Sequence, residues 1–150
     1  MLKQQLKDEL KQAMLAKDTT KTSVLRMVIS AIGYYEIQKG GANYEATDED
    51  VMAVIEKEAK QHKDSIEQFK NANRTELVEK EEKELAILQN YLPEQLSEDE
   101  VRKLVGDSID QTGASSPADM GKVMSALMPK IKGKADGNIV SRLVREALAK

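Results

Sequence analysis

An all-α protein in two parts is the fold that this sequence predicts. Apolar residues recur every three or four positions along almost all of the 150 residues, which is the spacing of one helix face. Tyr occurs 4 times, Phe once and Trp never, so the core must be largely aliphatic, and this favours packed helices over a β-sandwich. No stretch has the strict alternation typical of a strand.

Four helices are predicted in the first part, residues 1–95. The glycine pair Gly40 and Gly41 separates the second from the third, and Thr47 with Asp50 has the pattern of a capping box. Pro93 ends the fourth. The predicted apolar stripes are Leu2, Leu6, Leu10 and Met14; Val24, Val28, Ile32 and Tyr35; Val51, Ile55, Ala59, His62, Ile66 and Phe69; and Leu77, Val78, Leu85, Leu88 and Leu92.

The second part, residues 96–150, opens after a short linker at 93–96. Ser97 followed by Glu100 is a second capping box, and Gly113 ends the helix that it begins. The apolar stripe of this helix is Val101, Leu104, Val105 and Ile109.

Two further helices complete a three-helix C-terminal part. Ser116 as N-cap and Pro117 in the first turn predict the start of one, which Pro129 would end, and Asp136 would cap the other. Their predicted stripes are Met120, Val123, Met124, Leu127 and Met128, then Ile139, Val140, Leu143, Val144, Ala147 and Leu148.

The composition excludes several classes of protein. Without cysteine the chain can form no disulfide, thiolate nucleophile or thiolate-bound metal site. No apolar run approaches the roughly 20 residues that span a bilayer. The first residues, MLKQQLKDEL, have mixed charge, unlike a signal peptide. We therefore expect a soluble, cytoplasmic protein with no membrane partner.

Groups suited to catalysis are scarce. The single histidine, His62, lies on an apolar stripe, and we interpret it as partly buried at a helix interface rather than catalytic or metal-binding. Glu79, Glu81, Glu82 and Glu84 follow one another around a helix, which is typical of a solvated face. No Walker-type phosphate loop is present. The sequence thus predicts no catalytic residue, no metal site and no cofactor.

Positive charge gathers at the C-terminal end. Residues 1–116 hold 16 Lys and Arg against 23 Asp and Glu, a net charge of −7, whereas residues 117–150 hold 7 against 3, a net charge of +4. Such a surface suits phosphates, and the amides at a helix N-terminus can add to it. The candidate RNA-binding residues are Lys122, Lys130, Lys132, Gly133, Lys134, Gly137, Asn138, Arg142 and Arg145. Because residues 117–150 lack aromatic side chains for base stacking, we expect structured RNA rather than single strands.

The run ADMGKVMSALMPKIKGKADGNIVSRLV at 118–144 resembles the GatB/YqeY domain family. RMVISAI at 26–32, EAKQHKDSIEQF at 58–69 and ELAILQNYLPEQLSEDE at 84–100 extend the resemblance to freestanding YqeY proteins over essentially the whole chain. The signature positions of the family are matched by Gly121, Lys122, Met124, Pro129, Gly133, Asp136 and Gly137.

This resemblance implies that residues 96–150 are similar to the tail domain of GatB, a subunit of the tRNA-dependent amidotransferases. Those enzymes convert glutamate or aspartate misacylated on tRNA into glutamine or asparagine, and the tail helps to hold the tRNA. The family label, a carbon–nitrogen ligase with glutamine as amido-N-donor, follows from this kinship, but kinship of fold does not transfer a reaction.

Two hypotheses follow for the function. The first is a non-catalytic, tRNA-binding accessory protein whose partners are tRNA and an amidotransferase or aminoacyl-tRNA synthetase, with no role for DNA. The alternative is a protein-interaction adaptor with no RNA role, in which the acidic first part binds the partner. A ligase that acts alone is disfavoured because the chain offers no nucleophile.

Overall fold

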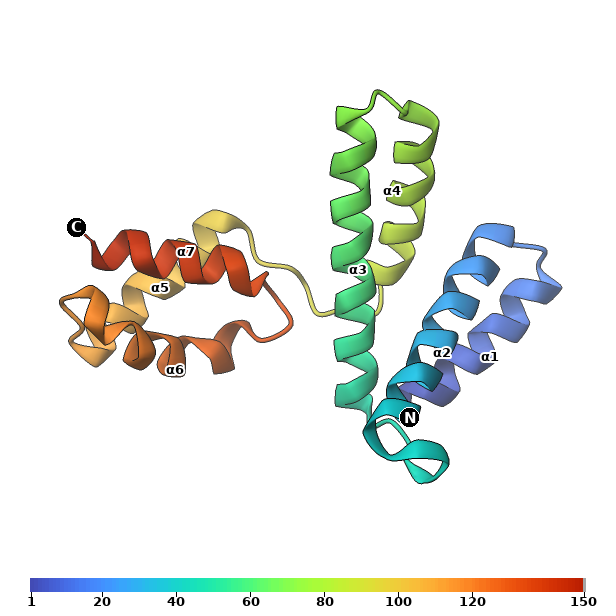
Figure 1. Ribbon diagram of the computed structural model, residues 1–150, viewed down its shortest axis with the longest axis horizontal. Helices are drawn as coiled ribbons and strands as arrows, with labels where there is room; N and C mark the ends of the chain where they lie inside the picture. The colour runs from blue at the N-terminus through green and yellow to red at the C-terminus, as the bar shows by residue number, and fades with distance from the viewer. Residues whose placement is uncertain (150) are drawn as a thin grey trace. The chain divides into compact units, whose positions relative to one another are not determined.

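All regular structure is helical in the part of the chain that the computed structural model describes, residues 1–149 (Figure 1). This confirms the all-α class. The α-helices in that range are α1 Leu2–Leu15, α2 Thr19–Gly40, α3 Asp48–Asn71, α4 Thr75–Gln89, α5 Glu98–Thr112, α6 Met120–Ile131 and α7 Gly137–Leu148, and the 3-10 helices are η1 Gly41–Asn43 and η2 Pro117–Asp119. None of the described helices is both long and apolar enough to cross a membrane.

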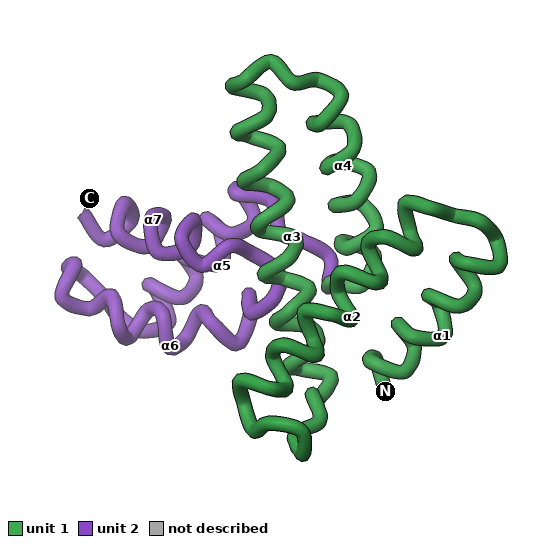
Figure 2. The backbone as a smooth tube through the Cα atoms, turned by 45° about the vertical axis from the view of Figure 1, so that its right-hand side comes forward, with its two compact units in different colours: residues 1–92 green, residues 93–150 purple. Residues whose placement is uncertain are grey.

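The chain divides into two compact units, Met1–Leu92 and Pro93–Lys150 (Figure 2). Unit 1 contains α1 to α4 and unit 2 contains α5 to α7. Each unit has a hydrophobic core of its own. That residues 1–95 and 96–150 fold as independent domains stays a prediction.

Unit 1 is built from two helical hairpins, α1 with α2 and α3 with α4 (Figure 1). The aliphatic stripes meet between the hairpins, so that Leu6, Leu25, Ile55 and Leu88, one from each helix, are fully buried. Burial of apolar surface of this kind is the main favourable contribution to folding. The short η1 turn then leads from α2 to α3.

The carboxylate of Asp50 ties the end of α2 to the start of α3. The predicted capping box is confirmed, since the Thr47 hydroxyl accepts from the Asp50 amide and the Asp50 carboxylate accepts from the Thr47 amide at 3.0 Å. The same carboxylate accepts hydrogen bonds from the hydroxyls of Tyr44 at 2.5 Å and Tyr35 at 2.8 Å. The bond from Tyr44 is the main cause of a strongly lowered pKa for Asp50, and it raises the pKa of Tyr44 to about 12.

Asp50→Asn should flatten the acid limb of the stability curve. Folding lowers the pKa of Asp50 from its ordinary value of 3.8, so the ionised carboxylate stabilises the fold at pH values above about 3.8. This stabilisation is lost as the pH falls and the carboxylate is protonated. We expect the free energy of unfolding, measured by urea titration at a series of acidic pH values, to drop less steeply below about pH 4 in the variant. Asp64→Asn, an exposed carboxylate on the same helix, is the control; an equal flattening there would contradict this role for Asp50.

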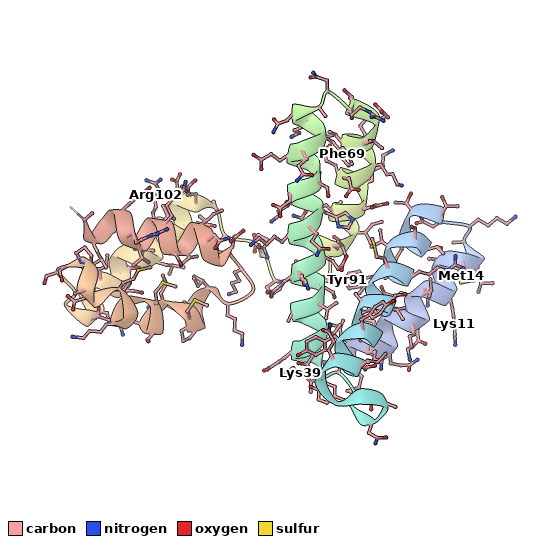
Figure 3. The ribbon with its side chains drawn as sticks, in the orientation of Figure 1. Lys11, Met14, Lys39, Phe69, Tyr91 and Arg102 are labelled. Carbon is pink, nitrogen blue, oxygen red and sulfur yellow. The ribbon has the colours of Figure 1, made fainter. Side chains whose placement is uncertain are left out.

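Three predicted core positions are wrong. Met14 is 49% exposed (Figure 3), Met128 is 39% exposed and Ile139 is 41% exposed, while Ala13 and Val140, the neighbours of Met14 and Ile139, are buried. Residues spaced strictly by four drift about 40° around a helix at each step, so Met14 has left the face that Leu2 and Leu6 begin. Ala13 takes its place in the core.

The predicted boundaries of α6 also need correction. Pro129 lies inside α6, which continues to Ile131, and the Lys132 amide still donates to the Met128 carbonyl at 2.9 Å. A proline in the last turn removes one hydrogen bond without ending the helix. At the other end Ser116 makes no side-chain cap; the carboxylate of Asp119 accepts from the Ser115 amide instead.

Candidate nucleic-acid interface

The candidate interface is the basic turn of unit 2, residues 130–136, together with the outer face of α7. Ile131 at the end of α6 and Val140 in the first turn of α7 are buried in the core of unit 2, and they fix the two ends of the turn. Asn138, Arg142 and Arg145 share the exposed face of α7, because they lie four and three residues apart.

The backbone of the basic turn is held by hydrogen bonds from the segment before α5 and by one bond within the turn. The side-chain amide of Gln95 donates to the Gly133 carbonyl at 2.9 Å, and the Leu96 amide donates to the Lys134 carbonyl at 2.8 Å. The Lys134 amide donates to the Ile131 carbonyl at 2.8 Å. The backbone conformation is therefore fixed before any ligand binds, which lowers the entropic cost of binding.

Gly133 and Gly137 have different structural roles. Gly133 has a φ of 76°, in the left-handed region that side chains disfavour. Gly137 begins α7, and a Cβ atom there would meet nothing within 4 Å. The geometry thus explains Gly133 by the shape of the turn, not by close approach of a phosphate.

Gly133→Ala should destabilise the protein by about 1–2 kcal/mol, because alanine is strained at this positive φ. Gly137→Ala should be neutral or stabilising by up to about 1 kcal/mol, since the position is open and helical. Urea unfolding of the two variants measures the difference. Equal effects would contradict the distinction between the two glycines.

Three lysines of the turn point into solvent without an ion-pair partner. Lys130, Lys132 and Lys134 are all exposed. The Nζ atom of Lys130 is 3.4 Å from the neutral side-chain oxygen of Gln111. Within residues 1–149 no carboxylate oxygen lies within 4.0 Å of these three ammonium groups or of the Arg145 guanidinium. Their charges are available to an anion.

Two other predicted residues are not part of this arrangement. Arg142 donates to the Glu98 carboxylate of α5 at 2.6 Å, and Arg102 (Figure 3) donates to the same oxygen at 3.1 Å. Lys122 lies 3.9 Å from the Asp119 carboxylate. It is also nine residues before the end of α6, which is roughly 13 Å along the helix from the turn.

The N-terminus of α7 is already occupied. The carboxylate of Asp136, the predicted N-cap, accepts from the Asn138 amide at 2.8 Å. A phosphate at this point would have to displace that carboxylate and overcome its negative charge. The Asn138 amide is therefore a poor phosphate contact. The exposed lysine side chains are the main evidence for a phosphate-binding surface.

The sequence predicted that the glutamates of α4 form a solvated face, and this prediction is wrong for Glu84. Glu84 is 7% exposed, and its carboxylate meets the buried His62 of α3. His62 does lie at a helix interface, and it is more fully buried than we expected. Glu84 precedes Leu88 by four residues and so lies on the same inward face of α4. This spacing could have predicted its burial, but the run of charged residues favoured a solvated face.

Comparison with known proteins gives consistent matches along the chain. The family described as Yqey-like protein matches residues 3–148. The protein "Altered inheritance of mitochondria protein 41, mitochondrial" of Pyrenophora tritici-repentis is 34% identical over 148 residues, which cover 95% of this chain and 78% of that protein. The proteins of the same name from Lachancea thermotolerans and Saccharomyces cerevisiae (strain YJM789) are 37% and 32% identical. Those matches cover 75% and 87% of this chain and 60% of each relative.

The names of these relatives place them in mitochondria, which differs from the cytoplasmic compartment that the sequence predicted. Two of the relatives are also considerably longer than the region they share with this chain. Neither the names nor the matched regions describe an activity or a ligand.

Proposed function

This chain belongs to the family of YqeY-like proteins, and we propose that it is a non-catalytic RNA-binding protein whose basic turn contacts the sugar-phosphate backbone of a folded tRNA. The observation that carries the proposal is the set of exposed, unpaired lysines on a turn with a fixed backbone. Fixed cations facing solvent suit an anionic polymer, because each phosphate that they neutralise releases bound counterions.

Recognition would depend on the shape of the RNA rather than on its bases. All aromatic residues of the chain precede residue 93, so unit 2 has no aromatic side chain on which an unpaired base could stack. Lysines act as point charges toward phosphates and carry little sequence information. A folded RNA, which presents closely spaced phosphates, is therefore the favoured ligand.

The resemblance of unit 2 to the GatB tail extends the proposal to a partner. In this account the four-helix and three-helix units are separate domains, and the protein assists an amidotransferase or an aminoacyl-tRNA synthetase by holding the tRNA. It contributes no catalytic residue to carbon–nitrogen bond formation. The compartment would be the one in which that partner works, and the mitochondrial relatives favour the mitochondrion for eukaryotic members of the family.

The test is binding of the purified full-length chain to labelled total tRNA at low salt, with unlabelled competitors. If the protein recognises the shape of tRNA, unlabelled tRNA should displace the labelled tRNA from it. Equal masses of a DNA duplex or of unstructured poly(U) should displace much less. Displacement by the duplex or by poly(U) as efficient as by tRNA would contradict shape recognition. Absence of binding at low salt would reject the RNA proposal as a whole.

A protein-interaction adaptor remains the second candidate because apolar side chains are exposed on α2. Met27, Tyr34 and Ile37 lie on one side of this helix, and Tyr34 is 72% exposed. Isolated exposed apolar residues are ordinary, but a continuous patch marks an interface. If this candidate is correct, Tyr34→Ser with Ile37→Ser abolishes binding to a purified amidotransferase or synthetase, and the full-length chain shows no affinity for tRNA.

A further inference from the structure

A histidine and two carboxylates converge inside unit 1. The Nε2 atom of His62 on α3 lies 3.0 Å from a carboxylate oxygen of Glu84 and 3.6 Å from one of Glu81, both on α4. The three potential ligand atoms lie within 4.8 Å of one another. His62 and Glu84 are only 6% and 7% exposed, so neither group is a chance neighbour on a solvated surface.

The hydrogen bond on the other side of the imidazole defines which nitrogen carries the proton. The Nδ1 atom of His62 lies 2.8 Å from the backbone carbonyl of Glu58. A carbonyl oxygen only accepts, so Nδ1 must donate its hydrogen to it. In the neutral ring Nε2 then has a free lone pair, and that lone pair faces the oxygens of Glu81 and Glu84. Three electron-rich atoms at these distances repel one another unless a metal cation or a proton lies among them.

We propose that His62, Glu81 and Glu84 bind a divalent transition-metal ion of the zinc type. In tetrahedral zinc sites the bonds to nitrogen and oxygen are about 2.0–2.2 Å, which places neighbouring ligand atoms roughly 3.3–3.6 Å apart. The observed separations of 3.0 and 3.6 Å from Nε2 to the two carboxylates bracket this range. An imidazole ligand favours zinc and its neighbours over calcium or magnesium, which prefer oxygen alone.

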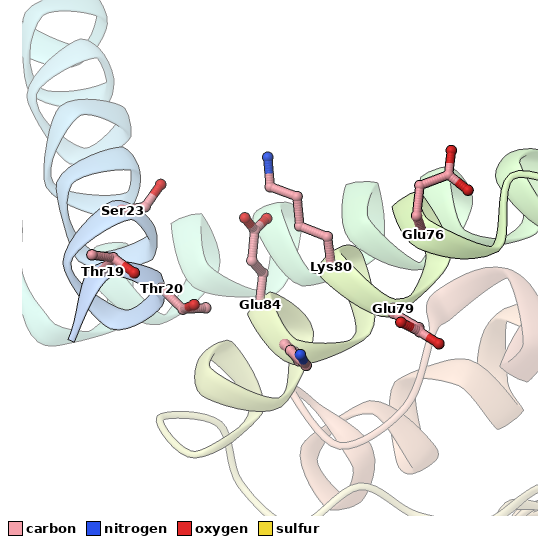
Figure 4. Close-up of a pocket in the computed structure, with 8 residues that line it drawn as sticks. Thr19, Thr20, Ser23, Glu76, Glu79, Lys80 and Glu84 are labelled. Carbon is pink, nitrogen blue, oxygen red and sulfur yellow. The ribbon is translucent and has the colours of Figure 1, made fainter.

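The surroundings of the three residues also suit a metal ion. Histidines that bind metals usually donate their second ring nitrogen to a carboxylate or a backbone carbonyl, as His62 does to Glu58. A cavity of about 380 Å³ opens beside the cluster, with Ser23 and Lys80 in its wall. Glu84 also lines the neighbouring pocket, where its carboxylate and the Lys80 side chain extend from the same side of α4 (Figure 4). Three protein ligands beside open space leave a fourth position for water or a small anion.

The competing explanation is an imidazolium that carries protons on both nitrogens and forms ion pairs with the two glutamates. Both explanations bury the same three side chains, so they differ only in what occupies the space at Nε2. A measurement on this nitrogen therefore decides between them.

Because His62 is the only histidine, long-range ¹H–¹⁵N NMR of the tag-free, full-length protein gives a single imidazole pattern. We expect that one equivalent of zinc moves the Nε2 resonance to the metal-bound range and leaves Nδ1 protonated. Unchanged ring resonances after zinc is added in excess would overturn the proposal. So would a ring that keeps a proton on both nitrogens in the presence of zinc.

Matched variants locate the metal. Glu84→Gln should reduce zinc binding, measured by equilibrium dialysis, by at least tenfold, whereas Glu79→Gln, an exposed glutamate on the same helix, should leave it unchanged. Equal losses in the two variants, or no loss in Glu84→Gln while circular dichroism shows it to be folded, would contradict the assignment. The wild-type NMR titration keeps the proposal testable if the buried variant does not fold.

Discussion

Replacement of Lys130, Lys132 and Lys134 together by glutamine should weaken binding to folded tRNA by roughly 100- to 1,000-fold at about 0.1 M monovalent salt. Each lysine that neutralises a phosphate contributes about 0.9 to the salt slope, so three lost contacts remove close to three logarithmic units of affinity at this salt concentration. All three side chains are exposed, and their replacement leaves the core of unit 2 intact. Fluorescence anisotropy with labelled tRNA measures the dissociation constant.

The matched control replaces Lys57, Lys60 and Lys63 on α3, which are also exposed, by glutamine. The change in net charge is the same, but these lysines are in unit 1. The control should lose no more than a few-fold in affinity. If the two triple variants bind equally well, the turn is not the contact surface, and general attraction between charges explains any binding that is observed.

Leu127→Ala should cost about 2–5 kcal/mol of stability and unfold unit 2 at lower denaturant than the wild type. Leu127 is fully buried in the core that joins α5, α6 and α7. This core is small, so the lost free energy is a large fraction of the total stability of unit 2. Since unit 2 carries the basic turn, tRNA binding should be lost at the same denaturant concentration as its fold.

The reciprocal control is Leu88→Ala, which removes a fully buried side chain from the core of unit 1. Urea unfolding followed by NMR reports on the two units separately. We expect each variant to shift the transition of its own unit and to leave the other within about 0.5 kcal/mol, as for distant, independent sites. Coupled shifts in both units would contradict two separate cores.

The parts of the fold that were predictable depend on neighbours in the sequence. The capping boxes at Thr47 and Ser97 and the end of α5 at Gly113 are confirmed, because each involves residues within one helical turn. Apolar spacing located the inward face of most helices for the same reason. It failed at Met14, where a strict four-residue spacing drifts away from the core.

The contacts that define the candidate sites join residues that are far apart in the sequence, and no local sequence pattern predicts them. The pairing of Gln95 with Gly133 crosses 38 residues, and that of Arg142 with Glu98 crosses 44. The first holds the basic turn, and the second pairs Arg142, a predicted cation of α7, with a carboxylate. His62 and Glu84 meet across 22 residues because α3 and α4 form a hairpin. Sequence spacing identified the residue types, while the fold decided which of them come together.

The central claim, that exposed cations of unit 2 bind the phosphates of a folded tRNA, is tested most directly by a salt series on the wild-type protein. If the three lysines of the turn and Arg145 neutralise about four phosphates, a plot of log K against log salt should have a slope between about −3 and −4. The triple glutamine variant should reduce it to about −1. A wild-type slope near zero, or no measurable affinity at the lowest salt, would contradict the claim.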